Sequence, residues 1–494
     1  MPDDISYSGR DELRATTKYR AYQAIGLVLG PSLFVLLIVL PAPTGLSGQA
    51  WATAAVAVWM AVWWATEALP LAATALLPLV LLPLLGILDV QQAAAPFANP
   101  LIFLFLGGFM IAAAVQRWGL HRRIALHIIA RIGHRPLNLV AGTMLATAML
   151  SMWISNTATA MMMLPIASSL VAITCGESHA LSGSKSNFAT AMMLGVAYAA
   201  SIGGLATLIG SPPNALAASY LLQESGIHIT FARWMLLAAP IAVVMLPLAW
   251  LILTRVAFPF SGETIEAESR PVTAMLDALG PISGPEKKVA IVFGLVAAGW
   301  ILHPLLADVF GVGGITDTGL AIAGAVVLFA IPADWRTRKF LLDWTAARQI
   351  PWGILILFGG GLSLAQAIDR TGLARWIGSG LDFLTGEPAF LLVAAVTLLV
   401  ILLTELTSNT ATTAALLPVV GALAGGADLA PLLLAASVSL AASSAYMLPV
   451  ATPPNAIVFG SGYVTLPQMM RAGLLLNIVG VIVITGFLML FAGR

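Results

Sequence analysis

The tripeptide Ser-Asn-Thr occurs twice in the chain, and each copy is a short polar group inside a long apolar stretch. We call the two copies the first island (Ser155, Asn156, Thr157) and the second island (Ser408, Asn409, Thr410). The two copies are 253 positions apart, and each is followed at the same distance by a proline, Pro165 or Pro418. Unpaired polar groups in a membrane interior are costly, so other protein groups, an ion or a substrate must satisfy each island.

A second motif, Pro-Pro-Asn, is also duplicated, at residues 212–214 and 453–455. Further matches separated by 253 positions are Gly107-Gly108 with Gly360-Gly361, Arg117 with Arg370, and Gly119-Leu120 with Gly372-Leu373. Ordered matches in four blocks indicate an internal duplication of the chain.

The types of residue in the islands suggest binding of both a cation and an anion. Free carbonyls at a helix break, with hydroxyl and amide oxygens, suit a hard monovalent cation, whereas the N-terminus of the returning helix suits an anion. Asparagine can serve both, because its amide offers an oxygen and an NH2 group. Ser151 and Thr404 lie four residues before the serine of each island, so we expect them to be cation ligands. Neither island contains Lys or Arg, so anion binding would depend on the bound cations.

The composition places these motifs in a membrane. Of 494 residues, 59% are hydrophobic and only 9% are charged, and the mean hydropathy is +0.95. Many apolar stretches are long enough to cross a bilayer. The net charge of +1 gives no reason to expect a nucleic-acid partner, and the single cysteine excludes an internal disulfide framework. We predict an all-α polytopic membrane protein.

The pattern predicts about 11 transmembrane helices and two re-entrant hairpins, each hairpin carrying one island. We expect a polar tail and first span in residues 1–50, and a first repeat in 51–258 with its hairpin at 137–173. A cytoplasmic linker is expected at 259–286, and a second repeat at 287–494 with its hairpin at 389–423. With the N-terminus inside, only 4 of the 23 Lys and Arg residues fall on the outer side. The repeats are then inverted, which is typical of secondary transporters.

These motifs resemble the divalent anion:sodium symporter family, which moves dicarboxylates, tricarboxylates or sulfate. The two Ser-Asn-Thr and two Pro-Pro-Asn motifs carry the resemblance, together with Glu67-Ala68-Leu69-Pro70 and Thr404-Glu405, and it covers roughly residues 20–490. It implies scaffold and transport domains, an inward-pointing and an outward-pointing hairpin, a homodimer, and an elevator-like motion in the inner (plasma) membrane. Na+ would be the co-transported ion, with no organic cofactor.

The resemblance also implies the residues that bind ion and substrate. One sodium site would use Ser151, Ser155, Asn156 and the Gly210 carbonyl, and the other Thr404, Thr407, Asn409 and the Ala451 carbonyl. The substrate would contact both islands and Ser211, Thr452 and Pro453.

Several functions remain as alternatives at this point. The first is sodium-coupled uptake of C4-dicarboxylates such as succinate, malate or fumarate. The others are a carrier of citrate or sulfate, and a sodium-independent or proton-linked exchanger in which Glu405 binds the proton. An intramembrane enzyme is disfavoured, because the spans hold no His-Glu-x-x-His motif and no paired aspartates. A channel is disfavoured by inverted repeats with interrupted helices.

Overall fold

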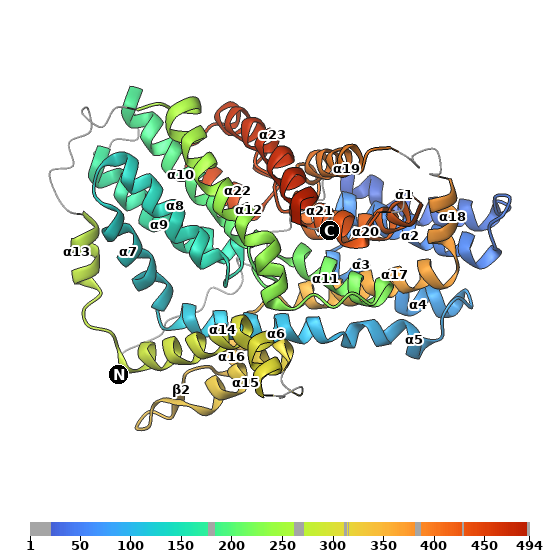
Figure 1. Cartoon of the computed structure of the whole chain (residues 1–494), viewed down its shortest axis with the longest axis horizontal. Coiled ribbons are helices and arrows are strands. Elements are labelled where there is room, and N and C mark those ends of the chain that lie inside the picture. The colour runs from blue at the N-terminus through green and yellow to red at the C-terminus, as the bar shows by residue number, and fades with distance from the viewer. Residues whose placement is uncertain are drawn as a thin grey trace, which may run out of the picture.

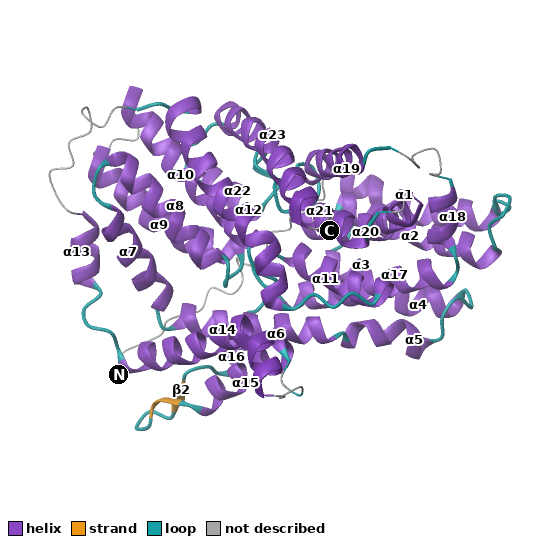
Figure 2. Ribbon diagram, viewed as in Figure 1, coloured by secondary structure: helices purple, strands orange, loops and turns teal. Residues whose placement is uncertain are grey.

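The structure is a computed structural model that describes residues 21–175, 183–260, 271–310, 314, 316–380, 387–426 and 429–491. The N-terminal tail (1–20) and residues 261–270 of the predicted linker lie outside the described residues. The described part is nearly all helical, as the sequence predicts (Figure 2). The exception is a pair of short antiparallel strands, β1 (Pro332–Asp334) and β2 (Lys339–Phe340), in the charged segment between two spans.

The first half of the chain contains the helices up to the predicted linker. They are α1 (Ala21–Val39), α2 (Gly48–Thr66), α3 (Leu71–Thr74), α4 (Leu77–Leu84), α5 (Val90–Ala94), η2 (Ala95–Ala98), α6 (Pro100–Arg117), α7 (Leu120–Ile132), α8 (Pro136–Ser151), α9 (Asn156–Cys175), α10 (Gly183–Leu205), α11 (Pro212–Ser225), α12 (Phe231–Leu251) and η3 (Ile252–Ala257). The Glu67-Ala68-Leu69-Pro70 motif separates α2 from α3, and Glu67 ends α2 in a left-handed conformation with φ of 47°. The apolar stretch after this motif forms the two short helices α3 and α4 and not one long helix.

The second half repeats this plan with different helix lengths. Its helices are α13 (Pro271–Ala278), α14 (Gly284–Phe310), α15 (Asp317–Ala330), α16 (Trp344–Ala347), α17 (Trp352–Arg370), α18 (Leu373–Ser379), α19 (Ala389–Thr404), α20 (Asn409–Gly426), α21 (Pro431–Ala442), α22 (Pro453–Phe459) and α23 (Leu466–Phe491). Helix α13 lies within the range predicted for the linker.

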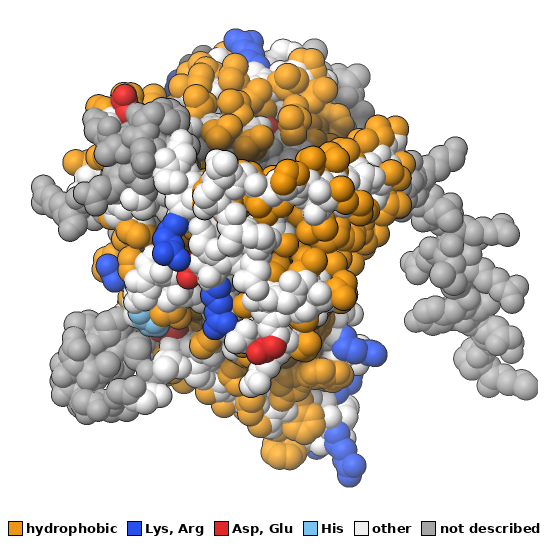
Figure 3. All heavy atoms as spheres, turned by 90° about the vertical axis from the view of Figure 1, so that its right-hand side faces the viewer, with side chains coloured by type: hydrophobic (Ala, Val, Ile, Leu, Met, Phe, Trp, Pro, Cys, Tyr) orange, Lys and Arg blue, Asp and Glu red, His pale blue; other side chains and the backbone are white. Residues whose placement is uncertain are grey.

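The surface and the helix lengths both fit a multi-span membrane protein. Among the described residues, seven helices are long and apolar enough to cross a membrane, and further apolar helices of 10–17 residues include α8, α19 and α20. Broad hydrophobic areas cover the face drawn in Figure 3, and charged side chains occur there only at scattered points.

Each island lies where a pair of helices is broken. Helix α8 ends at Ser151 and α9 begins at Asn156, while α19 ends at Thr404 and α20 begins at Asn409. We call the connecting residues the first tip (152–155) and the second tip (405–408). The break is favoured locally because serine caps helices well: the Ser155 hydroxyl accepts from the Ala158 N–H at 3.4 Å.

The two Pro-Pro-Asn motifs begin helices after a second kind of break. The first interruption (residues 206–211) separates α10 from α11, and the second interruption (residues 443–452) separates α21 from α22. Prolines suit the first helical positions because their missing N–H would be unpaired there anyway. The residues before them have nearly the same backbone geometry, with φ and ψ of −140° and 135° at Ser211 and −140° and 147° at Thr452.

The helices after the interruptions are exchanged between the two halves. Helix α11 of the first half packs against α20 and α21 of the second, while α22 packs against α9 and α10 of the first half. In Figure 1, α8, α9 and α10 form one group and α20 and α21 another, with α11 beside α17. Each broken helix pair therefore packs against a helix from the opposite half of the chain.

Two ion pairs fasten the charged segments near the helix ends. Arg117 at the end of α6 lies 2.6 Å from Asp343, and Arg123 of α7 lies 2.6 Å from Glu286. The Ala346 backbone N–H and the Arg117 guanidinium hold the pKa of Asp343 below its usual value. The basic helix α7 is therefore held to the beginning of α14.

Candidate ion and substrate site

The first site is built where α8 ends, around the amide of Asn156. With its NH2 group turned toward them, Asn156 donates to the Gly210 carbonyl at 3.1 Å, the Ala200 carbonyl at 3.1 Å and the Ser151 hydroxyl at 2.7 Å. Ser151 in turn donates to the Ala200 carbonyl at 2.7 Å. Three of the four predicted ligands of the first sodium site, Ser151, Asn156 and Gly210, are thus brought together.

Glycines allow this approach of backbone to side chain. A Cβ at Gly204 would overlap the side-chain amide of Asn156. A Cβ at Gly210 would lie 2.7 Å from the Gly204 carbonyl oxygen and 3.1 Å from the Ser151 carbonyl oxygen. The first interruption therefore lies directly against the first tip, and any larger residue at either position would push the oxygen atoms apart.

The fourth predicted ligand, Ser155, does not join this cluster through its hydroxyl. Its hydroxyl accepts from the Ala158 N–H, and its carbonyl accepts from the Thr159 N–H at 2.9 Å. Ser155 thus acts locally as the cap of α9.

The second site repeats the first in its central contacts. Thr404 donates to Asn409 Oδ1 at 2.7 Å and to the Ala442 carbonyl at 3.0 Å, so it contacts an asparagine amide and a carbonyl as Ser151 contacts Asn156 and the Ala200 carbonyl. The other two predicted ligands, Thr407 and Ala451, have different hydrogen-bond partners. The Thr407 hydroxyl lies 2.6 Å from that of Thr412, and the Ala451 N–H donates to the Leu448 carbonyl at 3.2 Å.

The predicted substrate residues differ in how accessible they are. All six island residues, Ser155, Asn156, Thr157, Ser408, Asn409 and Thr410, are partly buried. Pro453 is exposed, whereas Ser211 and Thr452 are buried. The Ser211 hydroxyl lies 2.8 Å from that of Ser443, and the Thr452 hydroxyl accepts from the Asn455 N–H at 3.3 Å. Among the described residues, Ser211 and Ser443 form one of the hydrogen bonds that join the halves, and no hydrogen bond connects one island with the other.

Two asparagines that were not among the predicted site residues hold the interruptions in shape. Asn214 donates to the carbonyls of Gly204, Leu205 and Thr207 at 2.9, 3.3 and 2.7 Å. Asn455 donates to the carbonyls of Ala445 and Leu448 at 3.2 and 3.0 Å. These donors satisfy carbonyls that the helix break leaves free. The signal was present in the sequence, because the asparagine is part of the duplicated Pro-Pro-Asn motif.

Glu405 at the second tip has a set of partners that the sequence did not reveal. Its carboxylate accepts four hydrogen bonds of 2.8–3.1 Å from the N–H groups of Tyr446, Met447 and Leu448. Asn477 of α23 donates a fifth at 2.7 Å. The residue is only 4% exposed. Each of these contacts is a donor, so the two acceptor oxygens of the carboxylate are both satisfied.

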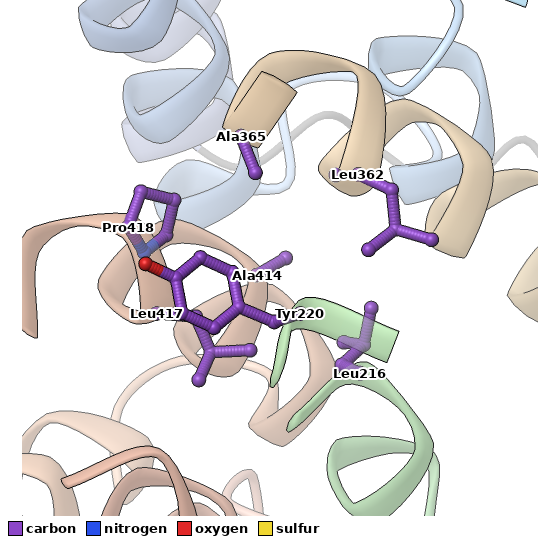
Figure 4. A pocket seen from close by; sticks show the side chains of 8 residues that line it. Leu216, Tyr220, Leu362, Ala365, Ala414, Leu417 and Pro418 are labelled. Carbon is purple, nitrogen blue, oxygen red and sulfur yellow. The ribbon is translucent and has the colours of Figure 1, made fainter. Parts of the chain in front are cut away.

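Two cavities lie beside the second helix pair. Figure 4 shows Tyr220 of α11 between Leu417 and Pro418 of α20, with Leu362 and Ala365 of α17 opposite. An adjoining cavity of about 430 Å³ is lined by residues of α11, α17, α18 and α20, including Glu224, Asp369 and Arg375. Helix α20 therefore meets α11 and α17 across a surface that is not fully packed.

Comparison with known proteins extends over almost the whole chain. The chain is 41% identical over 472 residues to the sodium-dependent dicarboxylate transporter SdcS of Staphylococcus saprophyticus, with 94% of this chain and 91% of that protein covered. It is 42% identical over 474 residues to the SdcS of Staphylococcus aureus strain USA300, with 94% and 90% covered. The crystal structure of the YdaH transporter of Alcanivorax borkumensis has a similar fold, with a TM-score of 0.58, 14% identity, and 96% and 97% covered.

The family comparison agrees with the resemblance that the motifs carry. Residues 22–492 match the family described as the sodium:sulfate symporter transmembrane region. Both duplicated motifs and both broken helix pairs lie inside this range. The chain is therefore a multi-span membrane protein that belongs to the sodium:sulfate symporter family.

Proposed function

We propose that this protein is a secondary active transporter that couples uptake of C4-dicarboxylates, such as succinate, malate or fumarate, to sodium. The observation that carries the proposal is the repeated cluster of a hydroxyl, an asparagine amide and backbone carbonyls at both tips. Relatives at 41% and 42% identity are named sodium-dependent dicarboxylate transporters, which supports the same ion, substrate class and activity here. The protein is thus a carrier and not an enzyme.

The oxygen-rich clusters have the chemistry that a monovalent cation requires. Ser151, Asn156 and the carbonyls of Ala200 and Gly210 would surround one sodium ion, with Ser155 as the further ligand. The NH2 group of Asn156 satisfies the carbonyls in one orientation, and its oxygen would face the ion in the other.

The second cluster would bind a second sodium ion with a similar set of oxygen atoms. Thr404, Asn409 and the Ala442 carbonyl would supply them, with Thr407 and the Ala451 carbonyl as predicted ligands that need a small rearrangement.

The anion would bind between the two islands. Helices α9 and α20 begin within the islands, so their N-terminal N–H groups carry partial positive charge toward that region. The islands contain no Lys or Arg, so the positive charge that offsets a dianion comes from the helix ends and the two cations. Anion binding without sodium is therefore unfavourable, and this gives the coupling its physical basis.

The movement that carries the substrate would be of the elevator type. We propose that α8–α9 and α19–α20 are re-entrant hairpins in inverted repeats, and that they move together with α11 and α22 against a scaffold. The exchange of α11 and α22 between the halves supports this, since it joins both hairpins into one body. The partly open surface between α20, α11 and α17 is where such a body would slide. A homodimer in the inner membrane with a cytoplasmic N-terminus completes the proposal.

Proton coupling through Glu405 is the less favoured alternative. Its carboxylate accepts hydrogen bonds from four separate donors. A bound proton would convert one of the acceptor oxygens into a hydroxyl, whose hydrogen would then face the hydrogen of a donor. Citrate and sulfate remain alternative substrates, which competition against succinate uptake would distinguish.

Uptake of labelled succinate into proteoliposomes tests the proposal. We expect uptake with a sodium gradient and a fall to background when choline replaces sodium. Uptake that persists unchanged in choline would contradict sodium coupling and favour an exchanger.

The island asparagines provide the matching variants. Asn156→Ala and Asn409→Ala each remove an amide that organises one cluster, so both variants should lose transport while they still reach the membrane. Full activity in both variants would exclude the islands from the mechanism. Glu387→Gln, which removes an exposed charge just before α19, is the matched control.

A further inference from the structure

Glu405 is a buried carboxylate that the proposed mechanism does not use. It follows Thr404, the central hydroxyl of the second cluster, and it is 4% exposed. Burying a carboxylate is costly unless hydrogen bonds compensate it, and here five hydrogen bonds do so. A buried charge with so many partners fixes the position of whatever it contacts.

What Glu405 contacts is the backbone of the second interruption. The N–H groups of Tyr446, Met447 and Leu448 point to its two oxygens. On the carbonyl side of the same segment, the Asn455 amide binds the oxygens of Ala445 and Leu448. Hydrogen bonds therefore fix the backbone of residues 445–448 on its N–H side through Glu405 and on its carbonyl side through Asn455.

Among the described residues, the first tip has no such group. The position 253 residues before Glu405 is Met152, whose side chain carries no charge. At the first tip the backbone carbonyl of Met152 accepts a hydrogen bond from the Thr207 hydroxyl. A neutral hydroxyl–carbonyl contact therefore stands where the second half places an anion.

We propose that Glu405 is a positioning residue for the second cation site. Its negative charge and its hydrogen bonds to the N–H groups of residues 446–448 set the affinity of that site for sodium. By accepting from the N–H groups of residues 446–448, the carboxylate fixes the backbone of the second interruption, which also carries the predicted ligand Ala451. It also offsets the charge of a cation at the adjacent Thr404–Asn409 cluster. The two proposed cation sites then differ in their affinity for sodium, because the second tip carries the charged Glu405 at the position where the first tip has Met152.

The inference rests on the proposed sodium coupling, and the experiment separates the two. Sodium is titrated against choline at constant ionic strength, with succinate saturating, and the half-saturating sodium concentration of uptake is measured. Sodium-dependent thermal stabilisation of the purified protein is measured in parallel, because it reports cation binding without transport. A wild-type protein that responds to sodium in neither measurement contradicts the proposed function itself.

For Glu405→Gln we expect the half-saturating sodium concentration to rise about tenfold or more, as the loss of a charged hydrogen-bond acceptor predicts. The KM for succinate at saturating sodium should change far less. A role in folding alone would lower the amount of active protein without moving the sodium curve. A sodium curve that coincides with that of the wild type, in uptake and in thermal stabilisation, overturns the inference.

A second variant keeps the test decisive if Glu405→Gln does not fold. Asn477→Leu removes one donor to Glu405 from α23 but leaves the carboxylate in place. We expect its half-saturating sodium concentration to rise about two- to threefold, as the loss of one hydrogen bond predicts. An unchanged value in this variant would then overturn the inference. Glu387→Gln, an exposed carboxylate at the start of the same helix pair, should match the wild type.

Discussion

The two clusters share the central hydrogen bonds of Ser151 and Thr404, but the two tips have very different surroundings. At the first tip, Trp153 stacks on Phe231 and Trp300 at 5.9 and 6.2 Å between ring centroids, and meets Phe293 edge-on at 5.4 Å. The matching residue of the second tip, Leu406, is 71% exposed. The duplication has thus kept the polar contacts of the two clusters and changed the packing around them. The two sites share their chemistry but are supported by different parts of the fold.

The largest effect is expected where the first site is packed most tightly. Gly204→Ala would place a methyl group against the Asn156 amide, which must then move away from Ser151 and Gly210. We expect succinate uptake to fall to background while the protein still reaches the membrane.

The matching position in the second half, Ala445, provides the comparison. It already carries a methyl group and is buried, so the second site tolerates a side chain where the first does not. We expect Ala445→Gly to keep uptake close to that of the wild type, because it adds no atom against the second cluster and the lost methyl group costs only about 1 kcal/mol of stability. Equal loss in both variants would mean that the sites are not packed differently.

The next largest effect concerns the asparagines of the interruptions. Asn214 binds three carbonyls and accepts from Ser439 at 2.9 Å, whereas Asn455 binds two carbonyls, and its Oδ1 has no partner among the described residues. We expect Asn214→Ala to lower the free energy of unfolding by about 3 kcal/mol and Asn455→Ala by about 2 kcal/mol, since each leaves buried carbonyls unpaired. Thermal unfolding in detergent measures both values, and a reversed order would contradict this reasoning.

The smallest effect concerns the tips themselves. Trp153→Ala removes three ring contacts from a partly buried side chain, and we expect it to lower the free energy of unfolding by about 2 kcal/mol. Leu406→Ala should change it by less than about 0.5 kcal/mol, because the side chain is largely exposed. The same unfolding measurement compares the pair. A loss at Leu406 as large as that at Trp153 would indicate a partner for the second tip, such as another copy of the chain.

Local sequence signals predicted the breaks in the helices well. Serine and asparagine favour helix starts, and paired prolines cannot continue a helix, so the ends of α8, α10, α19 and α21 could be predicted from the motifs. The duplication also indicated that Ser151 and Thr404 have equivalent roles, and the structure gives them equivalent partners.

Contacts that depend on distant segments could not be predicted in this way. The partners of Glu405 are mostly backbone N–H groups, which every residue carries, so no side-chain pattern marks them. The packing of α11 against the second half and of α22 against the first depends on the path of the chain and not on periodicity. The strands β1 and β2 are too short to produce an alternating pattern.

The hydrogen bonds between the two halves have a consequence for the order of synthesis. Asn214 accepts from Ser439, Tyr198 donates to the Met469 carbonyl at 3.2 Å, and Thr190 donates to the Tyr463 carbonyl at 3.1 Å. A ribosome makes the first half well before any of these partners exists. The newly inserted first half therefore holds buried polar groups whose final partners arrive only when α21 and α23 enter the membrane. The polar contacts of α10 are in this sense completed by the last helix of the chain.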